Sequence, residues 1–250
     1  MEQTEIDDAA MFLLHLRTQR TQVTGLPGEI APKTLDDAYA IQDAYHRFSG
    51  EPIGLTKIGC TSAIAQQVLG IPHPIAGRIT TAGVFRSGAS VPASFLHTQP
   101  LLECEIAVRI DASGAVDAYA PAIELVNARF SDTSKVSGPS LVADNSAGTA
   151  AVLGDAIEVA DAPDLTDLAI SLTTDSEQIA AGSTAALLGG VDSQVSWIAD
   201  HEASHGRTLE AGSWIITGTC TGLTPAPFGA TYTADFGPLG RVSFSLGDAA

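Results

Sequence analysis

The sequence predicts an α+β fold, with a small helical N-terminal part (residues 1–52) followed by a rolled, mostly antiparallel β core (residues 53–250). Apolar residues recur at helical spacing over the first fifty residues, whereas short apolar runs separated by glycine-rich turns follow from residue 53 onward. Hydrophobic residues make up 45% of the 250 residues and charged residues only 16%. This much apolar surface fills a sizeable core and excludes a disordered chain.

Two helices are expected in the N-terminal part. Thr4 and Asp7 are spaced as a capping box, which opens a helix that should fade near Thr21. Thr34 begins a second helix in the same way, and apolar residues then recur three or four positions apart until Gly50. The helical pattern ends there, so the β core is expected to begin close to residue 53.

The remaining segments are predicted to be strands with two more helices among them. Gly70 ends a short helix predicted over residues 63–69, and a later helix is predicted over residues 193–205. The clearest strand spans residues 101–110, where apolar side chains alternate on one face from Cys104 to Ile110. Further strands are predicted over residues 56–60, 141–153, 168–173, 214–217, 230–236 and 242–246.

Charge and cysteine content limit the partners and the compartment. With 12 basic and 29 acidic residues the net charge is −17, so the chain has no basic patch to neutralise phosphates. Neither nucleic acid nor a membrane is therefore an expected partner. No apolar run approaches the roughly 20 residues that span a bilayer, and the acidic N-terminus is unlike a signal peptide. The three widely spaced cysteines favour free thiols, and a cytoplasmic location is expected.

Three carboxylates form the strongest candidate for a chemical site. Glu103 and Glu105 are two positions apart in a predicted strand, which places them on one face about 6.5–7 Å apart. They could form an ordinary solvated face, but Glu124 lies in an apolar stretch where a lone acid needs a partner. That partner could be Arg129 in an ion pair. Alternatively, the three carboxylates form an oxygen ligand set for Mg²⁺ or Mn²⁺.

Lys57 is the second candidate, because it is one of three lysines and lies in an apolar segment. A depressed pKa would suit it to proton transfer, although a lysine at a strand end can also reach solvent. Asp144 and Asn145 offer donors and acceptors between apolar stretches, where an Asx turn is equally consistent. Backbone N–H groups near Thr217 and Gly218 could bind a carboxylate, or could simply belong to a glycine-permitted turn.

Several motifs, in order along the chain, point to a known family. They are Lys57-Ile58-Gly59-Cys60-Thr61-Ser62, Gln99-Pro100-Leu101-Leu102-Glu103-Cys104-Glu105-Ile106-Ala107, Glu124-Leu125-Val126-Asn127-Ala128-Arg129-Phe130, Val142-Ala143-Asp144-Asn145 and Gly212-Ser213-Trp214-Ile215-Ile216-Thr217-Gly218. Together they resemble the 2-keto-4-pentenoate hydratase / 4-oxalocrotonate decarboxylase family, within the fumarylacetoacetate hydrolase superfamily. Each motif is modest alone, but the ordered set covers almost the whole chain.

The resemblance implies a β core of the fumarylacetoacetate hydrolase type, usually in homo-oligomers, and a role for each candidate residue. Lys57 matches the family's active-site lysine, and Asp144 and Asn145 would orient that lysine or a water molecule. The residues that match the family's ligands for a divalent metal, expected to be Mg²⁺ or Mn²⁺, are Glu103, Glu105 and Glu124. The residues expected to bind the substrate are Thr61, Ser62, Thr217 and Gly218.

The implied activity is that of a hydratase in aromatic-compound catabolism, a lyase that adds water to 2-hydroxypenta-2,4-dienoate-like substrates through a metal-stabilised enolate. Three departures leave alternatives open. Ile75 stands where the family usually has an acid, Ala147 stands where relatives often have serine, and only eighteen residues separate Glu105 from Glu124. The chain could therefore be a decarboxylase of a 4-oxalocrotonate-like dicarboxylic keto acid, which needs no water-activating acid, or a non-catalytic homologue that binds keto acids.

Overall fold

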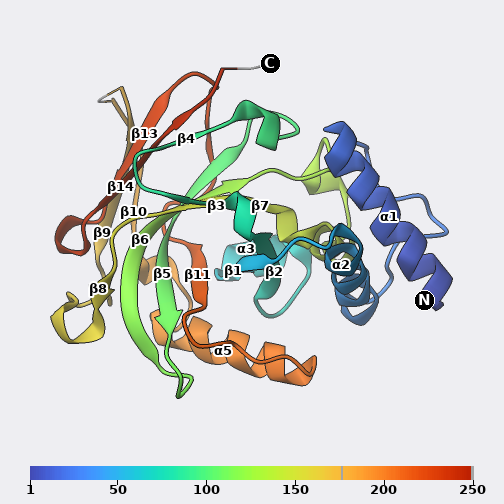
Figure 1. Cartoon of the computed structure of the whole chain (residues 1–250), viewed down its shortest axis with the longest axis horizontal. Coiled ribbons are helices and arrows are strands. Elements are labelled where there is room, and N and C mark those ends of the chain that lie inside the picture. The colour runs from blue at the N-terminus through green and yellow to red at the C-terminus, as the bar shows by residue number, and fades with distance from the viewer. Residues whose placement is uncertain (176, 249–250) are drawn as a thin grey trace.

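Two helices form one end of the molecule and pack against a β core. In the computed structural model, which describes residues 1–175 and 177–248, they are α1 (Gln3–Gln19) and α2 (Leu35–Ser49). Figure 1 shows them side by side, at the end of the molecule away from strands β9, β10, β13 and β14. Both helices bury apolar residues such as Leu13 and Ile41 in the same core as the strands. The helical N-terminal part is thus as predicted, and a division at residue 52 stays a proposal.

The capping residues set where these helices begin. Thr34 caps α2 as predicted. The predicted cap of α1 is wrong by two residues, because Glu2 is the N-cap and its N–H donates to the Glu5 carboxylate (2.8 Å), in place of Thr4 and Asp7. A carboxylate can satisfy the free N–H groups of a first helical turn as a hydroxyl does. The pairs Glu2/Glu5 and Thr4/Asp7 both have the spacing of a capping box, and the structure uses the first.

The β core consists of two sheets. The larger has nine strands, namely β2 (Ile75–Thr80), β1 (Ile53–Gly59), β11 (Trp214–Thr219), β5 (Leu101–Ile110), β6 (Val116–Val126), β7 (Gly148–Leu153) and β3 (Val84–Arg86) in this order, with β12 (Thr224–Pro225) paired to β5 and β8 (Ile157–Glu158) paired to β6. The smaller has five, in the order β10 (Glu177–Ser183), β9 (Ala169–Thr174), β13 (Thr231–Asp235), β14 (Arg241–Leu246) and β4 (Ala89–Val91). Within the described ranges, the pairs β1–β11, β3–β7 and β4–β14 are parallel and the other strand pairs are antiparallel.

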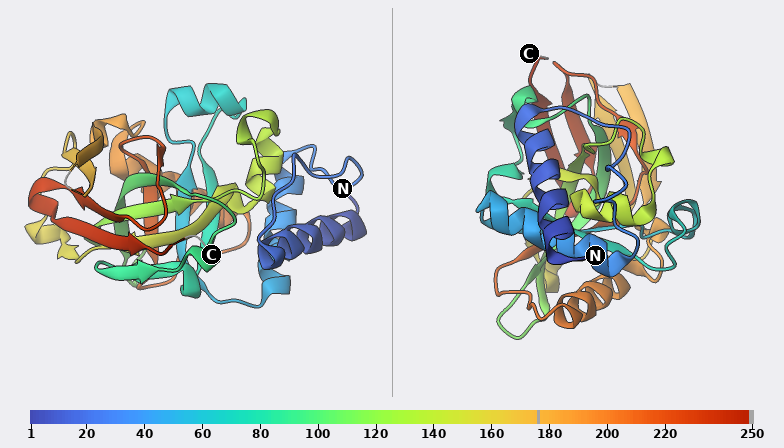
Figure 2. Two further views of the ribbon diagram at one scale, coloured as in Figure 1. Left: turned by 90° about the horizontal axis from the view of Figure 1, so that it is seen from above. Right: turned by 90° about the vertical axis from the view of Figure 1, so that its right-hand side faces the viewer.

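The larger sheet is curled around its long central strands β5 and β6 (Figures 1 and 2). Three further helices surround it, namely α3 (Ala63–Leu69), α4 (Gly138–Ala143) and α5 (Gly190–Ser204). Helix α2 packs on α4, and α5 packs against β11. The rolled, mostly antiparallel core is therefore confirmed. Among the residues that the structure describes, no helix has both the length and the apolar character needed to cross a membrane.

One predicted strand is wrong over half of its length. Residues 141–143 belong to α4, residues 145–147 form a turn with positive φ, and β7 begins only at Gly148. Ser137 caps α4 and accepts a hydrogen bond from the Ser140 N–H (3.2 Å), so local capping outweighs the apolar run that suggested a strand. The structure also adds strands that the pattern of apolar residues does not separate from loops, namely β2, β3, β4, β6, β8, β10 and β12.

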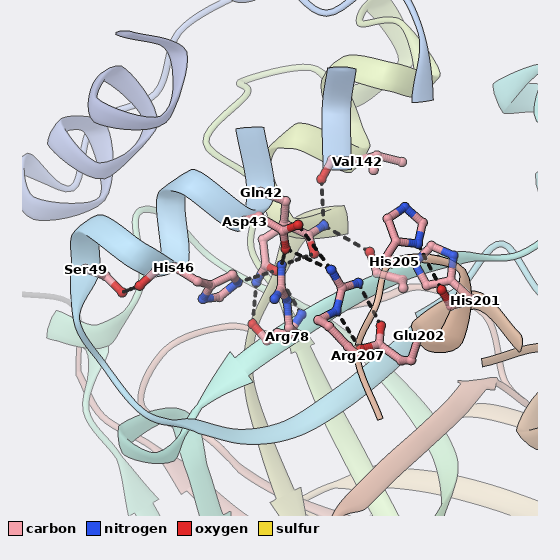
Figure 3. Close-up of polar contacts among 12 residues, drawn as sticks. Gln42, Asp43, His46, Ser49, Arg78, Val142, His201, Glu202, His205 and Arg207 are labelled. Atoms are coloured by element: carbon pink, nitrogen blue, oxygen red, sulfur yellow. Dashed lines mark hydrogen bonds and ion pairs between the residues drawn. The ribbon is translucent and has the colours of Figure 1, made fainter. Parts of the chain in front are cut away.

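A polar network joins the helical end to the β core (Figure 3). Arg207, just after α5, pairs with Asp43 of α2 (3.1 Å) and with Glu202 of α5 (2.7 Å). Arg78 of β2 pairs with the same Asp43. The network therefore holds α2 against β2, the strand that neighbours β1 in the larger sheet.

Candidate metal centre and active-site cavity

Three carboxylates meet on the central strands of the larger sheet. Glu103 and Glu105 come from β5, and Glu124 comes from β6, directly opposite Glu103. Alternation along β5 puts the first two on one face, and the antiparallel register brings Glu124 to them. One oxygen of each carboxylate lies within 4.8 Å of the other two, and the described residues hold no other group of three potential metal ligands this close.

The carboxylates are buried more deeply than a solvated strand face allows. Glu105 and Glu124 have no exposed surface, and Glu103 lines a cavity. Glu105 accepts a hydrogen bond from the Gly218 N–H (2.7 Å), while its Oε1 has no donor in the described part of the chain. Burial raises the pKa of all three, that of Glu103 to about 7, and the charge of Glu124 raises the pKa values of Glu103 and Glu105 further.

Lys57 of β1 lies beside this cluster. Its side chain is almost fully buried, its Nζ is 3.3 Å from Oε1 of Glu124, and it donates a hydrogen bond to the Ser146 carbonyl (3.0 Å). Burial alone lowers the pKa of Lys57, but the three carboxylates outweigh it and the pKa is raised. The depressed pKa that was considered from the sequence is therefore not found. The packing that buries Lys57 also places three carboxylates beside its ammonium group, and these favour the charged form.

The donor set fits a divalent cation. When ionised, three carboxylates and one ammonium carry −3 + 1 = −2, a charge that is costly to bury without a further cation. Glu105 Oε1 and both Glu124 oxygens lack a hydrogen-bond donor of good geometry within the described residues, so they are free to act as ligands. Mg²⁺ and Mn²⁺ prefer such oxygen ligands.

A cavity of about 370 Å³ opens beside the carboxylates. Lys57 and Glu103 are the only charged residues among those described that line it. Cys60 also lines the cavity, and burial raises the pKa of its thiol to about 11, so the thiol stays neutral. The large apolar side chains on the wall are Leu69, Ile75, Leu101, Val126, Phe130, Leu141 and Leu223. The cavity therefore combines one charged end with an uncharged remainder, where these apolar side chains alternate with amides and hydroxyls such as Gln22, Gln99 and Thr133.

The four residues expected to bind substrate divide into two pairs. Thr61 and Ser62 line the cavity, and Ser62 also caps α3 by accepting from the Ala65 N–H (3.2 Å). Thr217 and Gly218 of β11 are not among the cavity-lining residues. Thr217 donates to the Ile106 carbonyl (3.0 Å), and the Gly218 N–H donates to Glu105, so this pair supports the carboxylate cluster rather than facing the cavity.

Neither Asp144 nor Asn145 is a hydrogen-bond or ion-pair partner of Lys57, whose partners in the described chain are Ser146 and Glu124. Asp144 is fully buried and pairs with Arg129 through the guanidinium and the backbone N–H (2.8 Å to the N–H). An ion pair between Arg129 and Glu124, considered from the sequence, is therefore wrong, because Glu124 faces Lys57 instead. Asn145 hydrogen-bonds neighbouring backbone, and the two residues reach the cavity only through the chain that follows them.

Two residues of the site escape sequence reasoning. The Ser146 carbonyl binds Lys57, and the Thr219 hydroxyl hydrogen-bonds Glu103 and lowers its pKa against the effect of burial. Thr219 also pairs with Glu105 across β11 and β5. A backbone carbonyl is present in every residue, so the sequence does not single out that of Ser146. The role of Thr219 is indicated in the sequence only by its place directly after Thr217-Gly218.

Residues 83–244 match the family described as fumarylacetoacetate (FAA) hydrolase C-terminal. The chain belongs to the fumarylacetoacetate hydrolase family. This agrees with the resemblance drawn from the ordered motifs, and the matched range contains all three carboxylates.

Relatives of this chain are named either as hydratases or as decarboxylases. The chain is 30% identical to a 2-keto-4-pentenoate hydratase of Paraburkholderia phymatum, with 98% of this chain and 99% of that protein covered. It is also 30% identical to a 4-oxalocrotonate decarboxylase of Pseudomonas putida, with 84% of each covered. Its fold is similar to that of 4-oxalocrotonate decarboxylase from Pseudomonas putida G7 complexed with magnesium and adipate (TM-score 0.91, 25% identity, 98% of both chains).

Proposed function

We propose that this chain is a metal-dependent hydratase, a lyase that adds water to 2-hydroxypenta-2,4-dienoate or a closely related 2-keto-4-pentenoate substrate in aromatic-compound catabolism. The observation that carries the proposal is the buried group of three carboxylates beside Lys57 at one end of a cavity. The names of full-length relatives support it. A substrate carboxylate suits this charged end once a divalent cation neutralises the local charge of −2.

The residues that would hold the cation are Glu103, Glu105 and Glu124, and Mg²⁺ or Mn²⁺ is the proposed ion. Solved structures of similar fold are complexes with magnesium or calcium, which supports a divalent ion. When bound, such an ion supplies Lewis-acid stabilisation of negative charge on a substrate oxygen. The Gly218 N–H orients the Glu105 carboxylate, and Thr217 holds β11 against β5 at this point.

Lys57 is the proposed acid–base residue. Its ammonium group lies next to Glu124 and can donate a proton to, or hydrogen-bond, a substrate oxygen that enters the charged end of the cavity. Thr61 and Ser62 line the same cavity and are the proposed substrate-binding residues. Asp144 and Asn145 would act on Lys57 through the backbone, since neither side chain is a polar partner of its ammonium group.

The uncharged remainder of the cavity favours a monocarboxylic substrate. A second carboxylate buried there would have no cation beside it and would depend on amide and hydroxyl donors such as Gln22, Gln99 and Thr133. Lys57 is the only basic residue among the described residues that line the cavity, and it lies at the metal end. This observation favours the hydratase reaction over decarboxylation of a dicarboxylic keto acid.

A specific feature nevertheless keeps the decarboxylase as a second candidate. Ile75 lines the cavity and is almost fully buried, so no acid stands at this position to activate water. Loss of carbon dioxide from a keto acid needs the metal-binding end but no such acid. A non-catalytic binding protein is the third possibility that the same substitution raises.

One assay separates these functions. The chain is incubated with Mg²⁺ or Mn²⁺ and either 2-hydroxypenta-2,4-dienoate or 2-oxo-hexenedioate, and substrate loss and carbon dioxide are measured. Chelator-sensitive consumption of the monoacid supports the hydratase, and carbon dioxide release from the diacid alone supports the decarboxylase. No turnover of either, together with metal-dependent binding of oxalate, supports the binding protein and refutes both enzymes.

The remaining expectations are also proposals. A homo-oligomer is supported by the exposed apolar side chains of Ile64 and Val68 on α3, which are 75% and 74% exposed. Light scattering of the purified chain measures its mass directly, and a monomeric mass of 25.7 kDa would refute the oligomer. A cytoplasmic location remains a prediction from the cysteine content and the N-terminal sequence.

A further inference from the structure

Three consecutive residues that are not glycine adopt the left-handed backbone conformation beside Lys57. They are Asn145, Ser146 and Ala147, with φ of 55°, 51° and 59°. L-amino acids disfavour this region, and Asn is among the few that tolerate it. A run of three must be held in place by its surroundings, and such outliers gather where a site needs a particular backbone geometry. We call residues 145–147 the left-handed turn.

The left-handed turn aims one carbonyl group at the catalytic lysine candidate. The Ser146 carbonyl accepts the hydrogen bond from Lys57 Nζ (3.0 Å), and Ser146 and Ala147 both line the cavity. The other close partner of the ammonium is Glu124, 3.3 Å away. The carbonyl therefore fixes the position of an ammonium group that would otherwise be drawn further into the carboxylate cluster.

The Asn145 side chain holds the turn to strand β2. Its Oδ1 accepts from the Arg78 N–H (2.8 Å), and its Nδ2 donates to the Arg78 carbonyl (2.7 Å) and to the Gly148 carbonyl (3.0 Å). The fourth contact is to Nε2 of His46 on α2 (3.1 Å). Because Oδ1 only accepts, His46 must donate from Nε2. Figure 3 shows His46 pointing from α2 toward the Arg78 region.

Two neighbours of the turn complete its support. The Ser146 hydroxyl donates to the Ala76 carbonyl (2.7 Å). At Gly77 an added Cβ would lie 2.5 Å from the Asn145 carbonyl oxygen, so the close approach of β2 to the turn requires glycine there. The Asn145 amide thus holds the backbone of Arg78 and Gly148 and contacts the His46 side chain, and Asn145 is not among the residues that line the cavity.

We propose that Asn145, oriented by His46, is a positioning residue that acts on Lys57 through the Ser146 carbonyl. The proposal rests on the proposed function for its kinetic consequence, but its geometric content is independent of it. Loss of the Asn145 amide releases the left-handed turn, the Ser146 carbonyl turns away, and Lys57 loses its neutral partner. The carboxylates are untouched, so metal affinity and substrate KM are preserved while kcat falls.

The test compares two substitutions that delete the same hydrogen bonds. Asn145→Ala removes the amide and disfavours positive φ, whereas Asn145→Gly removes the amide and favours positive φ. For 2-hydroxypenta-2,4-dienoate with Mg²⁺, Asn145→Ala is expected to lower kcat on the order of 10²-fold with KM within threefold. Asn145→Gly is expected to recover to within roughly tenfold of the unmodified chain, because the carbonyl again points at Lys57.

A stability control and a structural readout accompany the kinetics. Thr184 is buried outside the cavity and accepts a hydrogen bond from the Leu168 N–H (2.8 Å), so Thr184→Ala costs stability and should leave kcat unchanged. Crystal structures of the metal-free variants should keep the Lys57 Nζ to Ser146 oxygen hydrogen bond in Asn145→Gly and lose it in Asn145→Ala.

Each outcome decides the proposal. It is overturned if Asn145→Ala keeps that hydrogen bond, if its kcat stays within twofold, or if Asn145→Gly loses as much kcat as Asn145→Ala. A fall in kcat for Thr184→Ala equal to that for Asn145→Ala would also overturn it, since general destabilisation would explain both. If the unmodified chain turns over no substrate, the proposed function fails, and the crystal structures alone decide the positioning role.

Discussion

Glu105→Gln tests whether the carboxylate cluster exists to bind a cation. The substitution keeps an oxygen to accept the Gly218 N–H and removes one buried charge. At an effective dielectric constant of about 20, two unit charges 4.8 Å apart interact by about 3.5 kcal/mol. Glu105 takes part in two such repulsions and one attraction to Lys57, so its removal relieves roughly one repulsion. Partial protonation of the cluster reduces this gain to about 1–3 kcal/mol.

The assay is thermal unfolding at pH 8 with chelator and with increasing Mg²⁺ or Mn²⁺. Without metal, Glu105→Gln should unfold at a higher Tm than the unmodified chain, by about 2–4 °C for each kcal/mol gained. With metal at about 100 times its Kd, the unmodified chain should gain about 2.7 kcal/mol, or roughly 5–10 °C, whereas the variant should gain little. Glu177→Gln, at an exposed acid remote from the cluster, is the matched control and should change neither value.

The reasoning is refuted if Glu105→Gln lowers the metal-free Tm, because the buried charge would then stabilise the fold without a cation. It is also refuted if the variant keeps the full metal-dependent rise. A buried acid whose removal stabilises the apo protein and abolishes metal binding is expected only where the carboxylates serve a ligand role.

Three further predictions follow from the same site. Lys57→Met should lower kcat by at least about 10²-fold while enlarging the metal-dependent rise in Tm, because no ammonium then offsets the carboxylates; an unchanged kcat contradicts the role of Lys57. Burial, aided by Arg78, lowers the pKa of His46 to about 3, so the folded chain keeps it neutral while the unfolded chain protonates it below about pH 6.5. Stability should therefore fall between pH 6.5 and 3 by up to about 1.4 kcal/mol per pH unit from this group, and His46→Asn should flatten that part of the urea-unfolding profile. Leu223→Arg, at the half-exposed rim of the cavity, should lower KM for 2-oxo-hexenedioate relative to the monoacid, and an unchanged KM ratio would mean that the substrate tail does not approach Leu223.

Local interactions account for what could be read from the chain directly. Thr34 caps its helix and residues 101–110 form a strand, because capping and side-chain alternation depend on near neighbours. The same locality explains the errors. Glu2 displaces Thr4 as the cap of α1, and the apolar stretch before β7 is divided by the Ser137 cap and by the left-handed turn.

The sequence by itself determined that Glu103 and Glu105 share a face and that Glu124 is an acid among apolar residues. Only the tertiary structure decided that Glu124 lies opposite Glu103 and beside Lys57, and that Arg129 pairs with Asp144 instead. The register of β5 with β6 and the packing of distant segments determine which residues become partners. A buried charge takes whichever partner that packing brings within reach, because desolvation forbids it to remain alone. The spacing of residues along the chain therefore does not predict which partner a buried charge will have.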